Sequence, residues 1–229
     1  MPRAWQESAG DRQGLPGSVA WSYDRTEILA DAVVHGLGVV AGLAATIVLV
    51  ALAAGRVGPW ELTSVVTYGG ALLAMLVASA LYNLWPVSPV KWVLRRFDHS
   101  AIYLLIAGTY TAFISQMRVG LESIALLVAI WLTALAGSAV KLRFPGRFDR
   151  LSVFLYLVTG WSGVMAYEAL AALPDSTVRL IVLGGVLYTV GIIFHAWRSL
   201  RFQNAIWHAF VLAAAACHYG ALLDCVVLT

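Results

Sequence analysis

Seven long apolar stretches fill almost the whole chain and limit its fold more than any other feature. A helix of roughly 20 apolar residues spans a hydrocarbon core of about 30 Å. Strands of a membrane barrel are shorter and alternate in hydrophobicity, which these stretches do not. The sequence therefore predicts an all-α polytopic membrane protein with seven transmembrane helices and short loops. The stretches run approximately over residues 28–54, 62–85, 99–117, 121–141, 151–172, 177–197 and 205–228.

The composition also indicates a membrane protein rather than a soluble domain. Of the 229 residues, 61% are hydrophobic and 12% are charged, whereas a soluble domain carries roughly 25% charged residues. Residues 1–26 are polar, with acids mixed in, and the apolar run that follows is too long for a signal peptide. We therefore predict a mobile cytoplasmic tail over residues 1–26 and one seven-helix transmembrane domain over residues 27–229.

The basic residues predict which way the helices face. Twelve of the fifteen Lys and Arg residues lie in the N-terminal tail or after the second, fourth and sixth apolar stretches. Since cytoplasmic loops are enriched in Lys and Arg, we expect a cytoplasmic N-terminus and an external C-terminus. The pI near 9.0 then needs no nucleic-acid partner, because these residues anchor the topology and favour anionic lipids. The basic residues on the predicted external side are Arg56, Arg118 and Arg179.

Polar residues recur near the predicted cytoplasmic ends of four helices. Glu27, Asp31 and His35 follow one another at intervals of four, so they share one face of the first helix. An ionisable side chain inside a bilayer costs about 2.5–3.5 kcal/mol on the insertion scale, so such residues mark a candidate site. We expect one polar layer in the cytoplasmic half of the bundle. Its members from the other helices are Ser79, Asn83, Asp98, Asn204 and His208.

Each of these residues also has a structural interpretation. Asp98 stands at the start of the third apolar stretch, where a carboxylate could cap the helix N-terminus. Glu27 has the same interpretation at the start of the first helix. A further candidate for the polar layer, His218, lies about 15 Å deeper than His208 along the last helix. Hydrogen bonds between helices are the alternative role for His35, Asn83, Asn204 and His218.

Four segments of the chain carry a family resemblance. They read SALYN (79–83), RRFDHSAIYLLIAGTYT (95–111), LGGVLYTVGIIF (183–194) and NAIWHAFVLAAAACHYG (204–220). Together they resemble the hemolysin III family, bacterial members of the progestin and adipoQ receptor (PAQR) superfamily that are also called membrane homeostasis proteins. The resemblance extends from about residue 25 to the C-terminus. It implies a seven-helix protein of the bacterial inner (plasma) membrane, with membrane lipids as partners and a lipid or fatty acid as the ligand class.

The resemblance also implies a metal site. Animal relatives bind zinc through an S-x-x-x-H histidine on the second helix and both histidines of H-x-x-x-H on the seventh. An aspartate on the third helix holds zinc-linked water in them, and hydrolysis of lipid amides such as ceramide has been attributed to them. The corresponding residues here are Ser79, Asn83, Asp98, Asn204 and His208. Two of the three expected histidines are therefore asparagines, and an amide oxygen is a weaker zinc ligand than imidazole. We predict no tightly bound cofactor, with zinc as the alternative.

Three functions follow from these observations. The first is a PAQR-like membrane protein that tunes membrane homeostasis and keeps a modified metal-type polar site. The second is a zinc-dependent lipid amide hydrolase, with Asp98 and Ser79 as catalytic residues and His208 as a metal ligand beside Asn83 and Asn204. The third is a pore-forming, cytolytic protein, suggested by the family name, although the central segments carry no ring of charges.

Overall fold

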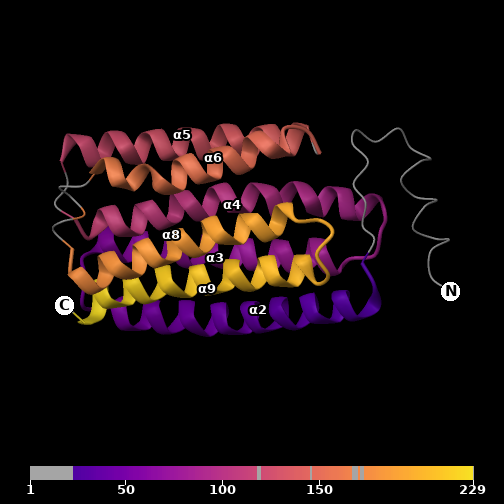
Figure 1. Cartoon of the computed structure of the whole chain (residues 1–229). Coiled ribbons are helices and arrows are strands. Elements are labelled where there is room, and N and C mark those ends of the chain that lie inside the picture. Colours follow the sequence, from indigo (N-terminus) through magenta and orange to yellow (C-terminus); the bar gives the residue numbers. More distant parts are fainter. Residues whose placement is uncertain (1–22, 118–119, 145, 167–169, 171–172, 229) are drawn as a thin grey trace.

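In the described part of the chain, seven α-helices lie side by side in one bundle (Figure 1). The computed structural model describes residues 23–117, 120–144, 146–166, 170 and 173–228, and within these ranges it contains no strand. Two short helical turns are also present: η1 (Ser162–Ala166) follows the helix that ends at Trp161, and η2 (Asp224–Leu228) follows the helix that ends at Leu223. The predicted all-α fold is confirmed. The helices are α2 (Arg25–Ala53), α3 (Pro59–Leu84), α4 (Pro89–Ser115), α5 (Leu121–Arg143), α6 (Asp149–Trp161), α8 (Asp175–Ala196) and α9 (Gln203–Leu223).

Five of these helices are long and apolar enough to cross a membrane: α2, α3, α5, α8, and α9 together with the start of η2. Helix α4 is long but less apolar, and it packs against α3, α5, α6 and α9. A helix enclosed by protein can carry more polar residues than one that faces lipid. Helix α6 has 13 residues, which at 1.5 Å per residue reach only about 20 Å. The seven predicted crossings are thus supported by length and composition for five helices.

Two boundaries differ from the sequence prediction. Helix α4 starts at Pro89, with Ser88 as its N-cap, about ten residues before the expected start. Asp98 therefore lies inside the helix, and the prediction that it caps the N-terminus is wrong. Helix α2 begins at Arg25, two residues before the predicted domain boundary, and residues 1–22 of the predicted tail lie outside the described residues.

The start of α2 is held by a capping box that involves Glu27. The backbone N–H of Glu27 donates to Asp24 Oδ1 (2.9 Å), and the backbone N–H of Asp24 donates to Glu27 Oε2 (2.9 Å). The other carboxylate oxygen of Glu27 accepts from the backbone N–H of Phe202 (2.9 Å), just before α9. The structural interpretation of Glu27 is therefore observed. Because Glu27 joins the two helix starts, it holds the first turns of α2 and α9 beside each other.

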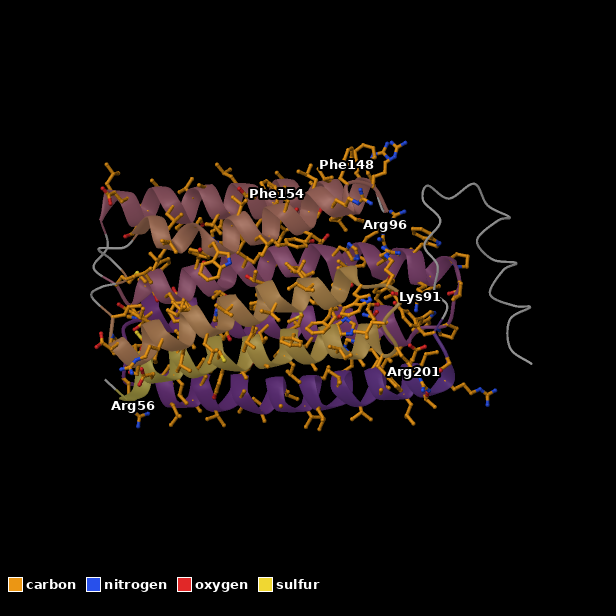
Figure 2. The ribbon with its side chains drawn as sticks, viewed as in Figure 1. Arg56, Lys91, Arg96, Phe148, Phe154 and Arg201 are labelled. Carbon is orange, nitrogen blue, oxygen red and sulfur yellow. The ribbon has the colours of Figure 1, made fainter. Side chains whose placement is uncertain are left out.

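Basic residues gather at one end of the bundle, which we call the basic end (Figure 2). Lys91, Arg96 and Arg201 lie there, near the start of α2, whereas Arg56 lies at the opposite end. Not all of the basic residues predicted to face the cytoplasm lie on the surface. Lys141 is 1% exposed, and its Nζ lies 2.7 Å from Asp149 Oδ1.

Asp149 ties three helices together at the basic end. Its second carboxylate oxygen, Oδ2, lies 2.7 Å from Nη2 of the buried Arg95. The carboxylate at the start of α6 thus neutralises a cation from α4 and a cation from α5. Opposite charges that pair in this way offset part of the cost of removing both from water.

Candidate functional site

Three helices bring five polar side chains together near the basic end, and we call this set the Asp31 cluster. Helix α2 packs against both α3 and α9, and the i, i+4 spacing on α2 and on α9 places two polar side chains on one face of each of these helices. Asp31 lies six residues into α2, roughly 9 Å from the helix start. The cluster consists of Asp31 and His35 from α2, Asn83 from α3, and Asn204 and His208 from α9.

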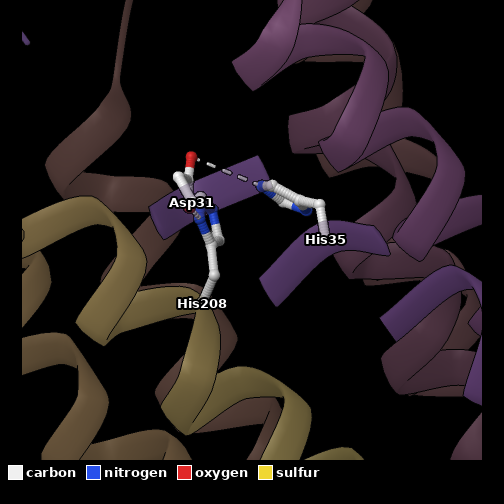
Figure 3. Close-up of side chains that lie close together, drawn as sticks. All are labelled: Asp31, His35 and His208. Atoms are coloured by element: carbon white, nitrogen blue, oxygen red, sulfur yellow. Dashed lines mark hydrogen bonds and ion pairs between the residues drawn. The ribbon is translucent and has the colours of Figure 1, made fainter. Parts of the chain in front are cut away.

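Asp31 is the centre of the cluster (Figure 3). His208 Nδ1 lies 2.6 Å from Asp31 Oδ1, and the Asn204 amide donates to Asp31 Oδ2 over 2.8 Å. His35 Nε2 lies 3.6 Å from Oδ2, which is beyond hydrogen-bond length. The exposed fractions are 4% for Asp31, 5% for His35 and 8% for His208. The carboxylate is therefore buried, and its hydrogen bonds come mainly from α9.

The two asparagines at the expected histidine positions bond to each other. Asn204 Nδ2 donates to Asn83 Oδ1 over 3.1 Å. Asn83 Nδ2 donates to the Ser79 carbonyl one turn earlier (2.9 Å) and lies 3.5 Å from His208 Nε2. This pair links α3 to α9 by amide hydrogen bonds, which is the structural alternative expected for both residues. Their positions also place them directly around the Asp31 carboxylate and the His208 ring.

Asp98 and Ser79 lie at the edge of the cluster. Both are buried, and Ser79, His208 and His35 lie near enough to the Asp98 carboxylate to act on its charge. His99 Nε2 lies 4.0 Å from Asp98 Oδ2 on the other side. The two residues predicted to be catalytic are thus brought to the same buried region as His208.

His218 lies apart from the Asp31 cluster. Its Nε2 is 3.2 Å from the carbonyl oxygen of Ile181 on α8, and its ring packs against Phe113 and Tyr188. The expectation that His218 joins the polar layer is therefore replaced by its structural alternative, a hydrogen bond between helices. Ten residues along α9 carry it too far from His208 to meet the same groups.

Two small pockets flank the cluster. The first is lined by Tyr23, Glu27, Asp31, Asn83 and Asn204, among others, and lies toward the basic end. The second is mainly apolar and runs between α2, α3 and α9, where it is lined by Gly38, Met75, Leu76 and Leu212 and reaches His35 and His208. The cluster therefore contributes to both pockets, and the first has the larger share of polar lining residues.

Asp31, His35 and His208 form a group that could hold a metal ion. One ligand atom from each residue lies within 4.8 Å of the others. The sequence pattern placed all three in the polar layer but named only His208 as a ligand, beside Asn83 and Asn204. The missed signal was the i, i+4 spacing of Asp31 and His35, which presents a carboxylate and an imidazole on one helix face.

Sequence comparisons identify the family of this chain. A family model described as "Haemolysin-III related" matches residues 25–219. The chain belongs to the hemolysin III family. Because the chain belongs to this family and has five long apolar helices, it is an integral membrane protein. The resemblance inferred from the four sequence segments is therefore confirmed.

Relatives of this hemolysin III protein occur in bacteria and in animals. It is 40% identical over 198 residues to the "Hemolysin-3 homolog" of Bacillus subtilis (strain 168), covering 86% of this chain and 93% of the relative. It is 35% identical over 198 residues to the "Hemolysin-3" of Bacillus cereus, covering 86% and 90%. The human "Monocyte to macrophage differentiation factor" is 27% identical over 169 residues, covering 71% and 70%. No solved structure matches the chain.

Proposed function

We propose that this hemolysin III protein resides in the bacterial inner (plasma) membrane and tunes membrane homeostasis through the Asp31 cluster. In this proposal all seven helices cross the membrane, with the start of α2 on the cytoplasmic side and the end of α9 outside. The gathering of Lys91, Arg96 and Arg201 at one end of the bundle supports that orientation. The Bacillus relatives support a bacterial plasma membrane as the location.

The buried Asp31 carboxylate is the observation that carries the proposal. Burying an ionisable group in a membrane bundle costs free energy, so residues of this kind are kept where they act on a ligand or a partner. Here the carboxylate lines the first pocket, and its neighbours His35 and His208 line the more apolar second one. The ligand would be an amphipathic lipid or fatty acid, whose polar group would meet the Asp31 cluster. Because the pocket beside Met75, Leu76 and Leu212 has a volume of only about 20 Å³, the helices would have to move apart there to admit the chain.

A metal-dependent lipid amide hydrolase is the second candidate function. The observation that favours it is the closeness of Asp98 and Ser79 to a carboxylate and two imidazoles. When zinc is bound at such a set, it supplies a water of lowered pKa. In this candidate function, the Ser79 hydroxyl and the Asp98 carboxylate would orient the amide of the substrate or accept a proton from the attacking water.

Membrane order in living cells tests the first function. Bacteria that lack the gene would carry the wild type, Asp31→Ala or His218→Ala, and a fluorescent lipid-order probe would follow a temperature shift. We expect the wild type and His218→Ala to restore the order response, and Asp31→Ala to fail at equal membrane abundance. An equal response with Asp31→Ala would show that the cluster is not the working site.

Assays on the purified proteins test the other two functions, lipid amide hydrolysis and pore formation. Fatty acid released from a ceramide-type amide by the wild type, and lost in Asp98→Ala, would support the hydrolase. Leakage of a trapped dye from protein-containing vesicles would support a pore. If the vesicles retain their dye and the lipid amide is not hydrolysed, both alternatives are rejected and the membrane-homeostasis function is retained.

A further inference from the structure

We propose that Asp31, His35 and His208 form a site for one divalent transition-metal ion, zinc in the first instance, with its ligands on α2 and α9. This ligand set differs from the one implied by the S-x-x-x-H and H-x-x-x-H resemblance, which would use α3 and α9. It concerns the same cluster as the proposed function, but metal binding is measured independently of any membrane effect.

The geometry of the three side chains fits a single ion. Zinc binds histidine nitrogen at about 2.0–2.1 Å, so two ligand atoms of one tetrahedral ion lie roughly 3.3–3.4 Å apart. Asp31 Oδ2 and His35 Nε2 are 3.6 Å apart, and Asp31 Oδ1 and His208 Nδ1 are 2.6 Å apart. Figure 3 shows the three side chains turned toward one another from two helices. One ligand atom from each residue lies within 4.8 Å of the other two, so the three side chains would have to draw together by up to about 1.4 Å to reach the spacing around one ion.

His35 supplies the second, independent observation. Its Nε2 is buried without a hydrogen-bond partner, although it points toward the Asp31 carboxylate. An unpaired buried polar atom costs roughly 1–3 kcal/mol. The neighbouring pocket is lined largely by apolar side chains such as Val34, Met75 and Leu76, so it offers a water few polar partners. A metal ion between His35 and Asp31 would use this nitrogen.

The surrounding amides would orient the ligands. Asn204 Nδ2 donates hydrogen bonds to Asp31 Oδ2 and to Asn83 Oδ1. The Asn83 amide also faces His208 Nε2 at 3.5 Å. The Asn83 NH₂ can donate to that nitrogen while His208 Nδ1 carries the proton. With Nδ1 bound to a metal, Nε2 carries the proton, and the Asn83 amide would turn its oxygen toward it and give up the bond from Asn204. Partners of this kind fix the ring orientation of a ligating histidine.

The donor atoms and the charge favour a zinc-like ion. Two imidazoles and one carboxylate match zinc and neighbouring transition metals, whereas calcium and magnesium prefer oxygen ligands throughout. A dication bound to Asp31 retains one positive charge, and the buried Asp98 carboxylate lies nearby to balance it. Asn83 and Asn204 could offer only amide oxygens, and the oxygen of Asn83 already accepts a hydrogen bond from Asn204.

Metal content of the purified full-length protein tests the proposal. After any histidine tag is removed, the protein in detergent would be loaded with zinc, desalted and measured by elemental analysis. We expect about one zinc per chain in the wild type, none retained in His35→Ala or Asp31→Ala, and full retention in His218→Ala. Asn204→Ala should weaken zinc binding by roughly 10–100-fold, because it removes the hydrogen bond that orients Asp31.

Two outcomes would overturn the site. One is a wild-type protein that binds no zinc, and the other is a His35→Ala protein that still holds one zinc per chain. If the variants fail to fold, X-ray absorption of the zinc-loaded wild type decides, because the proposed set contributes two imidazoles and the α3–α9 set contributes one. If a variant such as Asp31→Ala loses zinc but restores the lipid-order response in cells, the metal site is confirmed and its role in membrane homeostasis is rejected.

Discussion

Three carboxylates each link their own helix to other parts of the bundle. Asp31 joins α2 to α9, Asp149 joins α6 to both α4 and α5, and Glu27 joins α2 to the backbone of Phe202. In a poorly hydrated interior a charge is stable only when hydrogen bonds or opposite charges surround it. Each of these acids thus stabilises the packing of its helix against particular neighbours.

The Asn204→Ala variant tests this linking role at one residue. It leaves Asp31 Oδ2 and Asn83 Oδ1 without the donor that they share. We expect a loss of about 1–3 kcal/mol in the free energy of unfolding, measured by thermal unfolding in detergent. The control is Gln116→Ala, since that side chain bonds to its neighbour Ser115 rather than to another helix. Equal losses in the two variants would show that the cluster adds nothing special to stability.

Among the helices, α4 is central to the packing of the bundle. It contacts α3, α5, α6 and α9, and its buried residues include Tyr103, whose ring packs edge-on against Tyr156 at 4.5 Å between centroids. Helix α5 approaches this ring closely because Gly137 has no side chain. A Cβ atom at Gly137 would lie 2.6 Å from Tyr103 Cε2, closer than packed atoms tolerate.

The Gly137→Ala variant should therefore weaken the α4–α5 contact. We expect about 1–3 kcal/mol of destabilisation, as for other overpacked interiors, seen as a lower unfolding temperature in detergent. Gly70→Ala in α3 is the matched control, because no atom lies within 4 Å of its added Cβ. That variant should be neutral or slightly stabilising, since alanine favours helix over glycine. A stable Gly137→Ala protein would mean that α5 can shift away from Tyr103 without loss.

For the whole molecule, the distribution of charge and apolar surface agrees with a bundle that spans the membrane. The outer face of α2 exposes apolar side chains such as Leu29, Leu37 and Val40, as contact with lipid chains requires. Lys91, Arg96 and Arg201 lie at one end and Arg56 at the other (Figure 2). Because cytoplasmic segments are enriched in Lys and Arg, we expect the basic end to lie in the cytoplasm.

Labelling of single cysteines tests that orientation. In a background with Cys217 and Cys225 replaced by alanine, Ser199→Cys would mark the basic end and Arg56→Cys the opposite end. Both positions are exposed. We expect a membrane-impermeant thiol reagent to label Arg56→Cys in intact spheroplasts and Ser199→Cys only after lysis. The reverse pattern would show that the N-terminus lies outside.

The sequence by itself determined the all-α class, the family and the depth at which polar residues gather. The length of an apolar run fixes how a helix can cross a bilayer, and the i, i+4 spacing fixes which side chains share its face. Asp31 and His35 on α2, and Asn204 and His208 on α9, could be placed at one level in this way. These conclusions need no knowledge of which helices are neighbours.

Only the tertiary structure decided which of those side chains meet. Asp98 proved to lie inside a longer α4, His218 bonds to α8, and the cations Arg95 and Lys141 are buried around Asp149. These outcomes depend on how each helix is rotated about its axis and on what packs beside it. Spacing within one helix carries no information on either, so the contacts among Asp31, His35 and His208 could be seen only once α2 and α9 were packed together.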